Sequence, residues 1–94
     1  MHVRWTRRAL AALDGIAEYI AQDNPSAARR IVRRVQGAVA DLGSHPAIGR
    51  SGRVAGTREL VVSGTPFIVP YRVREKTLEI LAVIHTARQW PDEF

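Results

Sequence analysis

Thr77-Leu-Glu-Ile-Leu-Ala-Val-Ile-His85 is the stretch that decides the fold, because it is apolar on both alternating faces before it ends in an imidazole. Successive side chains of a β-strand point to opposite faces of the sheet. Here one face would carry Leu78, Ile80, Ala82 and Ile84, and the other would carry Thr77, Glu79, Leu81, Val83 and His85. Apolar residues on both faces are typical of a buried sheet centre. We therefore expect one continuous central strand over 77–85, with a cover on each face of its sheet.

Two amphipathic helices precede this strand and would cover one face of the sheet. Thr6 is a suitable N-cap for a helix over 7–22, and Asn24 followed by Pro25 begins a second helix. Because the connection is very short, the helices must pack as an antiparallel hairpin. The apolar positions recur at helical spacing, at Leu10, Leu13, Ile16, Ala17 and Ile20, and then at Ala28, Ile31, Val32, Val35, Ala38, Val39 and Leu42.

Three further segments have the pattern of strands, namely 2–5, 58–63 and 67–73. Pro70 cannot donate to a ladder, so we expect solvent or a bulge beside it. The order β-α-α-β-β-β predicts a single α+β domain over 1–94, in which an N-terminal strand and an antiparallel helical hairpin precede a three-strand antiparallel meander. The helices should pack on one sheet face. The pairing partner of the first strand stays open.

Two irregular segments have features of their own. Residues 47–56 form a glycine-bearing loop with Arg50 and Arg53, and this loop is longer than a turn requires. After His85, Trp90 and Phe94 make the C-terminal segment too apolar for a free tail. We expect these two aromatic residues to anchor the tail to the sheet.

Composition excludes several classes of protein. The chain has no cysteine, which excludes disulfides and thiol chemistry, and no apolar run reaches the roughly 18 residues of a membrane span. The N-terminus lacks a signal-peptide segment, so we expect a cytoplasmic protein without a membrane partner. The formal net charge is +5, and all but one of the 14 Lys and Arg residues are arginine. Arginine suits carboxylate and phosphate partners, although codon bias in a GC-rich genome would also raise its share.

Four arginines, Arg29, Arg30, Arg33 and Arg34, lie opposite the apolar stripe of the second helix. No acidic residue at i+4 neutralises any of them. We call this set the basic ridge. Its plain interpretation is a solvated helix face, and its functional interpretation is an anion-binding surface.

The chain resembles the RelE/ParE superfamily of toxins from bacterial type II toxin–antitoxin modules, and the ParE branch more closely. The resemblance covers nearly the whole length and rests on motifs in a fixed order: Trp5-Thr6 with Ala9 and Leu13, Tyr19-Ile20 with Asn24-Pro25 and Ala27-Ala28, Pro46 with Gly49-Arg50, Gly56-Thr-Arg-Glu-Leu60, Tyr71-Arg72-Val73, and His85-Thr-Ala-Arg-Gln-Trp-Pro91. It implies a growth-inhibiting toxin in a hetero-oligomer with an acidic antitoxin that wraps it. It also implies one of two targets, DNA gyrase for ParE-like members or ribosome-bound messenger RNA for RelE-like members.

Metal-free RNA cleavage requires an acid, a base and cations around one phosphate. His85 is the candidate acid or base, and Arg72, Arg58 and Arg88 are the candidate cations. Many nuclease members of the superfamily place an arginine three residues before the strand tyrosine, where this chain has Ile68. This departure favours gyrase binding over cleavage. A structural role for His85 at a strand end, and an ion pair for Arg58 with Glu59 or another acid, remain alternatives.

The helical hairpin can cover only one sheet face, and the sequence contains no third helix. An uncovered apolar face would bind a partner, and an acidic, initially disordered antitoxin segment fits there. The expected contact residues for antitoxin or target are Arg58, Arg72, Leu81, Val83, His85, Arg88 and Trp90. A small basic nucleic-acid-binding module is the third interpretation, although most aromatic residues fall at core positions. The scattered histidines predict no metal site, and the sequence has no phosphate-binding glycine loop, so we expect no cofactor.

Overall fold

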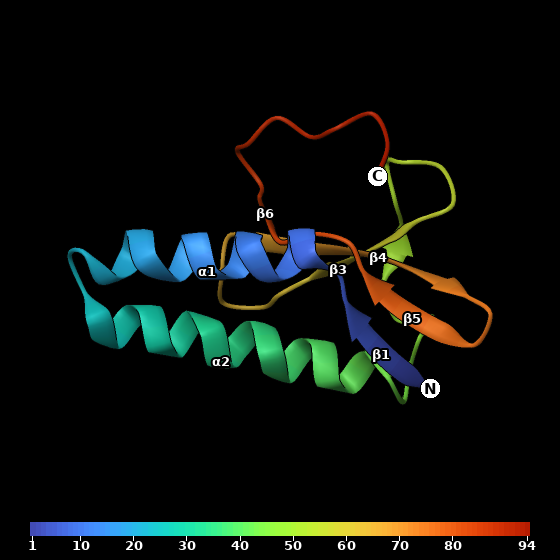
Figure 1. Ribbon diagram of the computed structural model, residues 1–94, viewed down its shortest axis with the longest axis horizontal. Helices are drawn as coiled ribbons and strands as arrows, with labels where there is room; N and C mark the ends of the chain where they lie inside the picture. Colours follow the sequence, from blue (N-terminus) through green and yellow to red (C-terminus); the bar gives the residue numbers. More distant parts are fainter.

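The chain forms a helical hairpin packed on one face of a mixed six-stranded sheet, as a computed structural model of residues 1–94 describes (Figure 1). This confirms the predicted α+β architecture. The elements are β1 (His2–Trp5), α1 (Arg7–Ala21), α2 (Pro25–Leu42), β2 (Arg50–Ser51), β3 (Arg58–Val61), β4 (Phe67–Arg74), β5 (Thr77–Ile80) and β6 (Ile84–His85). The expected meander is β3, β4 and β5, to which β2 and β6 add two short strands.

Both helices begin at the caps that the sequence predicts. The Thr6 hydroxyl accepts a hydrogen bond from the Ala9 N–H at 3.2 Å, and the Asn24 side chain accepts one from the Ala27 N–H at 3.0 Å. Each cap satisfies an N–H that has no partner inside its helix. The two helices therefore start at defined residues and run antiparallel along the sheet.

The first strand, whose partner the sequence leaves open, pairs in parallel with β5. Val3 lies opposite Leu78 and Trp5 opposite Ile80, so β5 lies between β1 and β4 in the order β1-β5-β4-β3-β2. Thr6 fastens this pairing, since its hydroxyl donates to the Ile80 carbonyl at 2.7 Å while it caps α1. The N-terminal strand thus sets the position of the hairpin on the sheet.

The prediction of one continuous strand over 77–85 is wrong, because the chain breaks between β5 and β6. Tyr71 pairs with Ile80 and Ile68 pairs with Ile84, so two residues of β4 face three residues of the other chain segment. One extra residue opposite a strand is a bulge. The bulge lies beside Pro70, whose carbonyl accepts from the Leu81 N–H at 2.9 Å and which has no N–H to return.

This bulge corrects the predicted faces of the C-terminal part of the stretch. A shift of one residue in register moves every later side chain to the opposite face. Leu81 stays on the face away from the helices, whereas Val83 joins the helix-side core and His85 lies opposite Phe67 of the same core. The three residues therefore do not share one surface.

The core lies between the helices and the sheet, where the side chains of alternate strand residues meet the apolar stripes of α1 and α2. Tyr71 of β4 is among its largest fully buried side chains. Its twelve buried members are Ala9, Leu13, Val35, Val39, Leu42, Val62, Phe67, Val69, Tyr71, Leu78, Ile80 and Val83.

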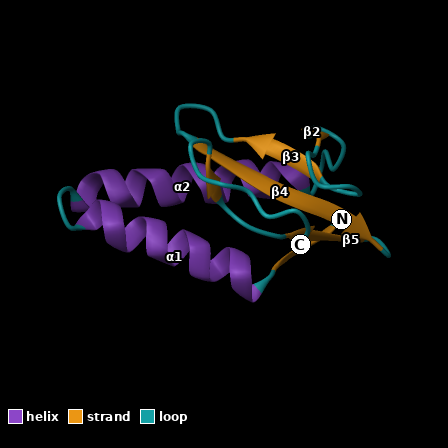
Figure 2. Ribbon diagram, turned by 90° about the horizontal axis from the view of Figure 1, so that it is seen from above, coloured by secondary structure: helices purple, strands orange, loops and turns teal.

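The second sheet face is less open than we expected. Ile68, Pro70 and Leu81 lie on this side, and none is more than 4% exposed. The loop after β2 folds over this face, and the Arg53 guanidinium lies 3.7 Å from the centre of the Trp90 ring. Figure 2 shows the loops overlying the strands on this side. The loop and the C-terminal segment thus cover the centre of the face that we expected a partner to cover.

Two arginines contact the aromatic residues of the C-terminal segment. The guanidinium carbon of Arg8 in α1 lies 5.1 Å from the centre of the Phe94 ring. Arg53 lies closer to the Trp90 ring, at 3.7 Å from its centre. Both are cation–π contacts. They tie the end of the chain to α1 and to the loop after β2.

Neither helix has the length and apolarity that a membrane span requires.

Candidate functional site

A groove of about 780 Å³ runs between α1 and the segment from β6 into the C-terminal tail. Phe67 and Val83 contribute to its apolar lining from the sheet side. Three small residues, Ala11, Ala12 and Gly15, leave space along its α1 wall. The residues of α1 that line it are Arg8, Ala11, Ala12, Gly15, Ile16, Tyr19 and Ile20. This is the largest hollow of the molecule, and it is mostly apolar.

Two arginines and a histidine lie beside this apolar lining. Arg8 comes from the first turn of α1, Arg88 follows β6, and His85 lies between the sheet and the tail. On α1, the Tyr19 side chain is 75% exposed. An apolar groove with cationic neighbours and an exposed aromatic residue is typical of a protein-binding surface.

His85 is held in place by its neighbours. Its ring meets the Phe67 ring edge-on at a centroid distance of 5.5 Å, and its Nδ1 accepts from the Ala87 N–H at 3.0 Å. The Arg88 N–H donates to the His85 carbonyl at 3.0 Å. These contacts fasten the start of the tail, which agrees with the structural alternative for His85.

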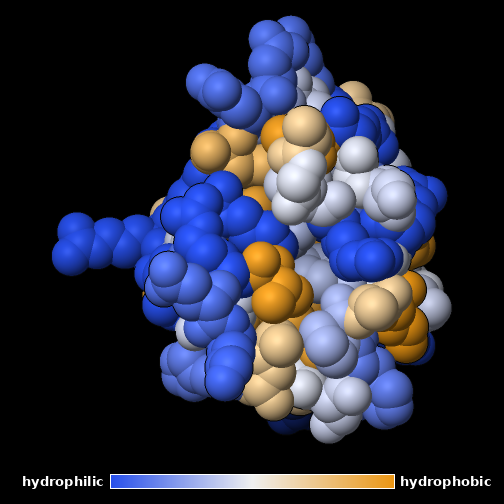
Figure 3. Space-filling view, turned by 90° about the vertical axis from the view of Figure 1, so that its right-hand side faces the viewer, coloured by the Kyte–Doolittle hydropathy of each residue, from blue (hydrophilic) through white to orange (hydrophobic).

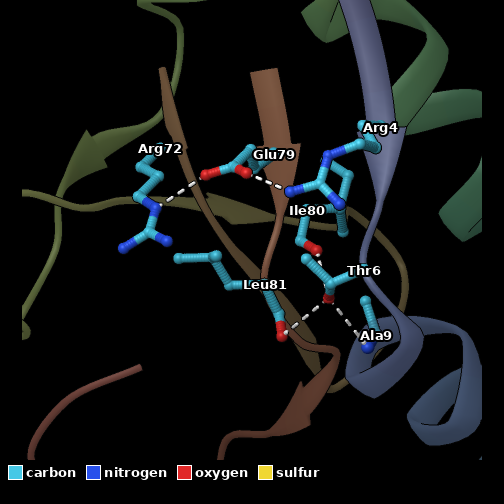
Figure 4. A network of polar contacts seen from close by, with 7 residues as sticks. All are labelled: Arg4, Thr6, Ala9, Arg72, Glu79, Ile80 and Leu81. Carbon is cyan, nitrogen blue, oxygen red and sulfur yellow. Dashed lines mark hydrogen bonds and ion pairs between the residues drawn. The ribbon is translucent and has the colours of Figure 1, made fainter. Parts of the chain in front are cut away.

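The second sheet face carries a carboxylate between two arginines (Figure 4). Glu79 lies opposite Arg4 on one neighbouring strand and opposite Arg72 on the other. Arg72 donates from Nε to Glu79 Oε1 at 2.8 Å, and Arg4 forms an ion pair with Oε2. The hydrogen bonds from Arg72 and then Arg4 hold the pKa of Glu79 below its ordinary value. Arg72 is therefore largely committed to the sheet.

A second cluster of the same kind surrounds Glu59. Its carboxylate accepts from the Arg53 backbone N–H at 2.8 Å, from Arg50 Nη2 at 3.2 Å and from Arg53 Nε at 3.3 Å. Burial raises the pKa of Glu59, but the hydrogen bonds from Arg53 and Arg50 outweigh burial and lower it. The sequence gives one signal for Glu79, an acidic residue inside an apolar strand, which we did not follow.

The end of the molecule at the right of Figure 1 is mostly hydrophilic, with a narrow apolar strip (Figure 3).

Arg58 holds the loop before β2 instead of forming the ion pair that we considered. Its Nη1 donates to the Gly49 carbonyl at 2.8 Å and to the Ala47 carbonyl at 3.3 Å. Tyr71, its partner across the strands, donates from its hydroxyl to the Pro46 carbonyl and accepts from the Gly49 N–H, both at 2.8 Å. Arg58 therefore acts in positioning the loop.

The residues that we expected to form one contact surface lie in several places. Arg72 and Leu81 lie on the second face, and Leu81 is only 4% exposed. Val83, His85 and Arg88 line the groove, although Val83 is also only 4% exposed. Arg58 binds loop carbonyls and Trp90 lies under Arg53, as described above. The groove thus keeps three of the seven predicted residues, and α1 supplies contacts that we did not predict.

The basic ridge is exposed along α2, as we expected. Arg34 also donates from Nη1 to the Ser63 carbonyl at 3.1 Å. No group of three or more His, Cys, Asp or Glu side chains gathers as a metal site would require.

Comparison with known proteins adds four findings. The family described as the ParE toxin of the type II toxin–antitoxin system parDE matches residues 3–90. The protein Y4kP of Sinorhizobium fredii is 51% identical over 89 residues, which cover 95% of this chain and 92% of that protein. Toxin RelE2 of Caulobacter vibrioides is 41% identical over 86 residues, which cover 92% and 96%. A solved structure of the chromosomal ParDE system from P. aeruginosa superposes with a TM-score of 0.81 at 33% identity, covering 90% of this chain and 95% of that one.

Proposed function

The chain belongs to the ParE toxin family of type II toxin–antitoxin systems, and we propose that it arrests growth by binding DNA gyrase. As a toxin of this type it has a cognate antitoxin as its partner. In the proposal the antitoxin occupies the groove between α1 and the tail, and the free toxin acts by contact rather than by catalysis.

The separation of the candidate catalytic residues is the observation that carries the choice of gyrase. His85 lines the groove on the helix side, whereas Arg72 lies on the opposite sheet face and donates to Glu79. Arg58 donates to the carbonyl groups of the loop before β2. RNA cleavage needs its acid, base and cations around a single phosphate. These residues are divided between opposite faces of the sheet, which favours a binding protein.

The groove fits an acidic, amphipathic segment of the antitoxin. Apolar side chains of the segment would cover Phe67 and the small residues of α1, and its carboxylates would meet Arg8 and Arg88. The exposed Tyr19 would supply an aromatic anchor, which is the residue type that most often dominates such interfaces. Folding of the segment on binding would cost ordering entropy that the buried apolar area offsets.

Supercoiling by purified DNA gyrase tests the target directly. Addition of the full-length toxin should inhibit supercoiling, and addition of the antitoxin should restore it. Cells that express the toxin should filament and show DNA damage while their bulk messenger RNA stays intact. Ribosome-dependent cleavage of messenger RNA with no effect on gyrase would overturn the proposal.

Ribosome-dependent RNA cleavage is the second candidate, because one relative carries the name Toxin RelE2. The groove would then be the reaction site, since His85 and Arg88 both line it. His85 would act as acid or base, and Arg88 would stabilise the phosphate charge. A purified translation system that contains the toxin and a short messenger RNA separates this candidate from gyrase inhibition.

A further inference from the structure

The basic ridge of α2 carries charge that no acidic side chain neutralises. Arg29, Arg30, Arg33 and Arg34 are all exposed, and none takes part in any of the four ion pairs of the protein. Those ion pairs use four other arginines, which share the carboxylates of Glu59 and Glu79. The formal net charge of the chain is +5, and the ridge gathers four positive charges on one helix.

The spacing of the ridge disfavours the helix that carries it. Arg29 with Arg33 and Arg30 with Arg34 are like charges at i and i+4, an arrangement that destabilises a helix. Charged residues that break a local rule without a compensating contact are expected at functional sites. An anion that bound to the ridge would remove this repulsion.

The ridge is separate from the groove, so both can be occupied at once. Ile31 is the residue of α2 that lines the groove, and no ridge arginine does. Figure 1 shows α2 at the edge of the molecule opposite the C-terminal loop. Arg29 and Arg33 instead border a shallow hollow between α1 and α2, which small residues such as Ala17 and Ala21 leave open. Glu18 borders the same hollow but forms no ion pair with either arginine.

We propose that the basic ridge binds the sugar–phosphate backbone of duplex DNA without reading its sequence. Arginines four residues apart lie about 6 Å apart along a helix axis, so the ridge presents a rigid row of phosphate-binding forks. No aromatic residue stands among them, which disfavours single strands that bind by base stacking. A helix of about 10–12 Å diameter fits the major groove of B-form DNA, whereas the narrow major groove of A-form RNA excludes it.

The salt dependence of DNA binding tests this surface. The full-length toxin is titrated into a fluorescent duplex of arbitrary sequence at several salt concentrations, and the slope of log K against log salt is measured. Each lost phosphate contact lowers the magnitude of this negative slope by about 0.9. In the triple variant Arg29→Gln/Arg30→Gln/Arg33→Gln, the magnitude of the slope should fall by about 2.7, and the variant should bind DNA more weakly. Arg34 is kept because it contacts Ser63.

A charge-matched variant provides the control. Arg7→Gln/Arg74→Gln/Lys76→Gln removes the same formal charge from exposed positions outside the ridge and the ion pairs, and it should retain nearly the whole slope. The triple lysine variant of the ridge should keep the slope, and circular dichroism melting checks that each variant folds. If the magnitude of the slope fell equally in the ridge and control variants, net charge alone would explain DNA binding, and the proposal would be overturned. Tighter binding of single-stranded DNA or duplex RNA of equal length would overturn the assignment to duplex DNA.

Discussion

Arg72 donates a hydrogen bond from Nε to Oε1 of Glu79, 2.8 Å away on the neighbouring strand. Arg4 binds the other carboxylate oxygen from the opposite side, so a buried charge inside an apolar strand is neutralised by β1 and β4 together. Buried carboxylates persist when they are paired and hydrogen-bonded in this way. The relationship joins the N-terminal strand to the meander, and it explains why an acidic residue occupies the sheet centre.

Replacement of Glu79 should destabilise the fold. Glu79→Gln removes the charge that Arg4 and Arg72 share, and hydrogen bonds to charged groups contribute about 1.5–3 kcal/mol each. We expect a loss of about 2 kcal/mol in the free energy of unfolding, measured by urea denaturation. Glu18→Gln, at an exposed site without an ion pair, should change it by less than about 0.5 kcal/mol. Equal effects of the two substitutions would show that the Glu79 cluster adds no stability.

Acid should weaken the protein through both buried glutamates. The folded state lowers the pKa of Glu79 and of Glu59 below the ordinary value of 4.5. Each group therefore adds stability above that value, and the contribution is lost as the pH falls through the lower pKa of the folded state. Urea unfolding between pH 7 and pH 2, roughly the range over which carboxylates titrate, should show this decline. A Glu59→Gln/Glu79→Gln variant should give a flatter curve, and an unchanged curve would contradict the assignment.

Gly49 has no room for a side chain. A Cβ atom there would lie 2.6 Å from the Tyr71 hydroxyl oxygen and 2.9 Å from the Glu59 carbonyl oxygen. Gly49→Ala should cost about 1–3 kcal/mol in the free energy of unfolding, which lowers the melting temperature of a chain this size by several degrees. Gly37→Ala is the matched control, because nothing lies within 4 Å of its added carbon, and it should stabilise α2 by about 0.5–1 kcal/mol. Melting temperatures that shift in the same direction would contradict this contrast.

Filling the groove should block the antitoxin. Gly15 lines the groove and nothing lies within 4 Å of a Cβ atom added there, so we expect Gly15→Phe to place a ring in the groove. We expect the Kd for the antitoxin to rise at least about tenfold, or 1.4 kcal/mol, in calorimetry. Gly37→Phe adds the same ring on α2 outside the groove and should leave the Kd unchanged. Undiminished binding by the Gly15 variant would place the antitoxin elsewhere.

His85 should be dispensable for toxicity if the protein acts on gyrase. His85→Ala removes the contacts with Phe67 and Ala87, so its folding is checked by circular dichroism. Growth arrest after induction should then match the unsubstituted toxin, with His45→Ala as an exposed control. A folded variant whose toxicity falls by about 10²-fold or more would favour general acid–base catalysis and the ribonuclease candidate.

The helices are the part of the fold that local sequence patterns predicted best. Thr6 and Asn24 cap the helices that they were predicted to cap, and most of the predicted apolar stripes of α1 and α2 face the sheet. Leu10 is the exception, because it is 48% exposed and lies outside the core. The grouping of the site residues was not predictable to the same extent. Val83 and His85 lie on the helix side because of the bulge beside Pro70, and the proline indicated only that some irregularity would occur there. The small residues of α1 that line the groove, Ala11, Ala12 and Gly15, were not part of any site that the sequence predicted.

From the amino-acid sequence alone came both helices, the strands β1, β3 and β4, the two-layer architecture and the family. The helices, strands and layers follow from caps, spacing and composition, which act between residues a few positions apart, whereas the family rests on the resemblance of the motifs. The tertiary structure decided the parallel partner of β1, the face on which each residue after Leu81 lies, and which carboxylate each arginine binds. Each of these depends on the register between segments far apart in the chain, and a one-residue shift in register reverses the outcome.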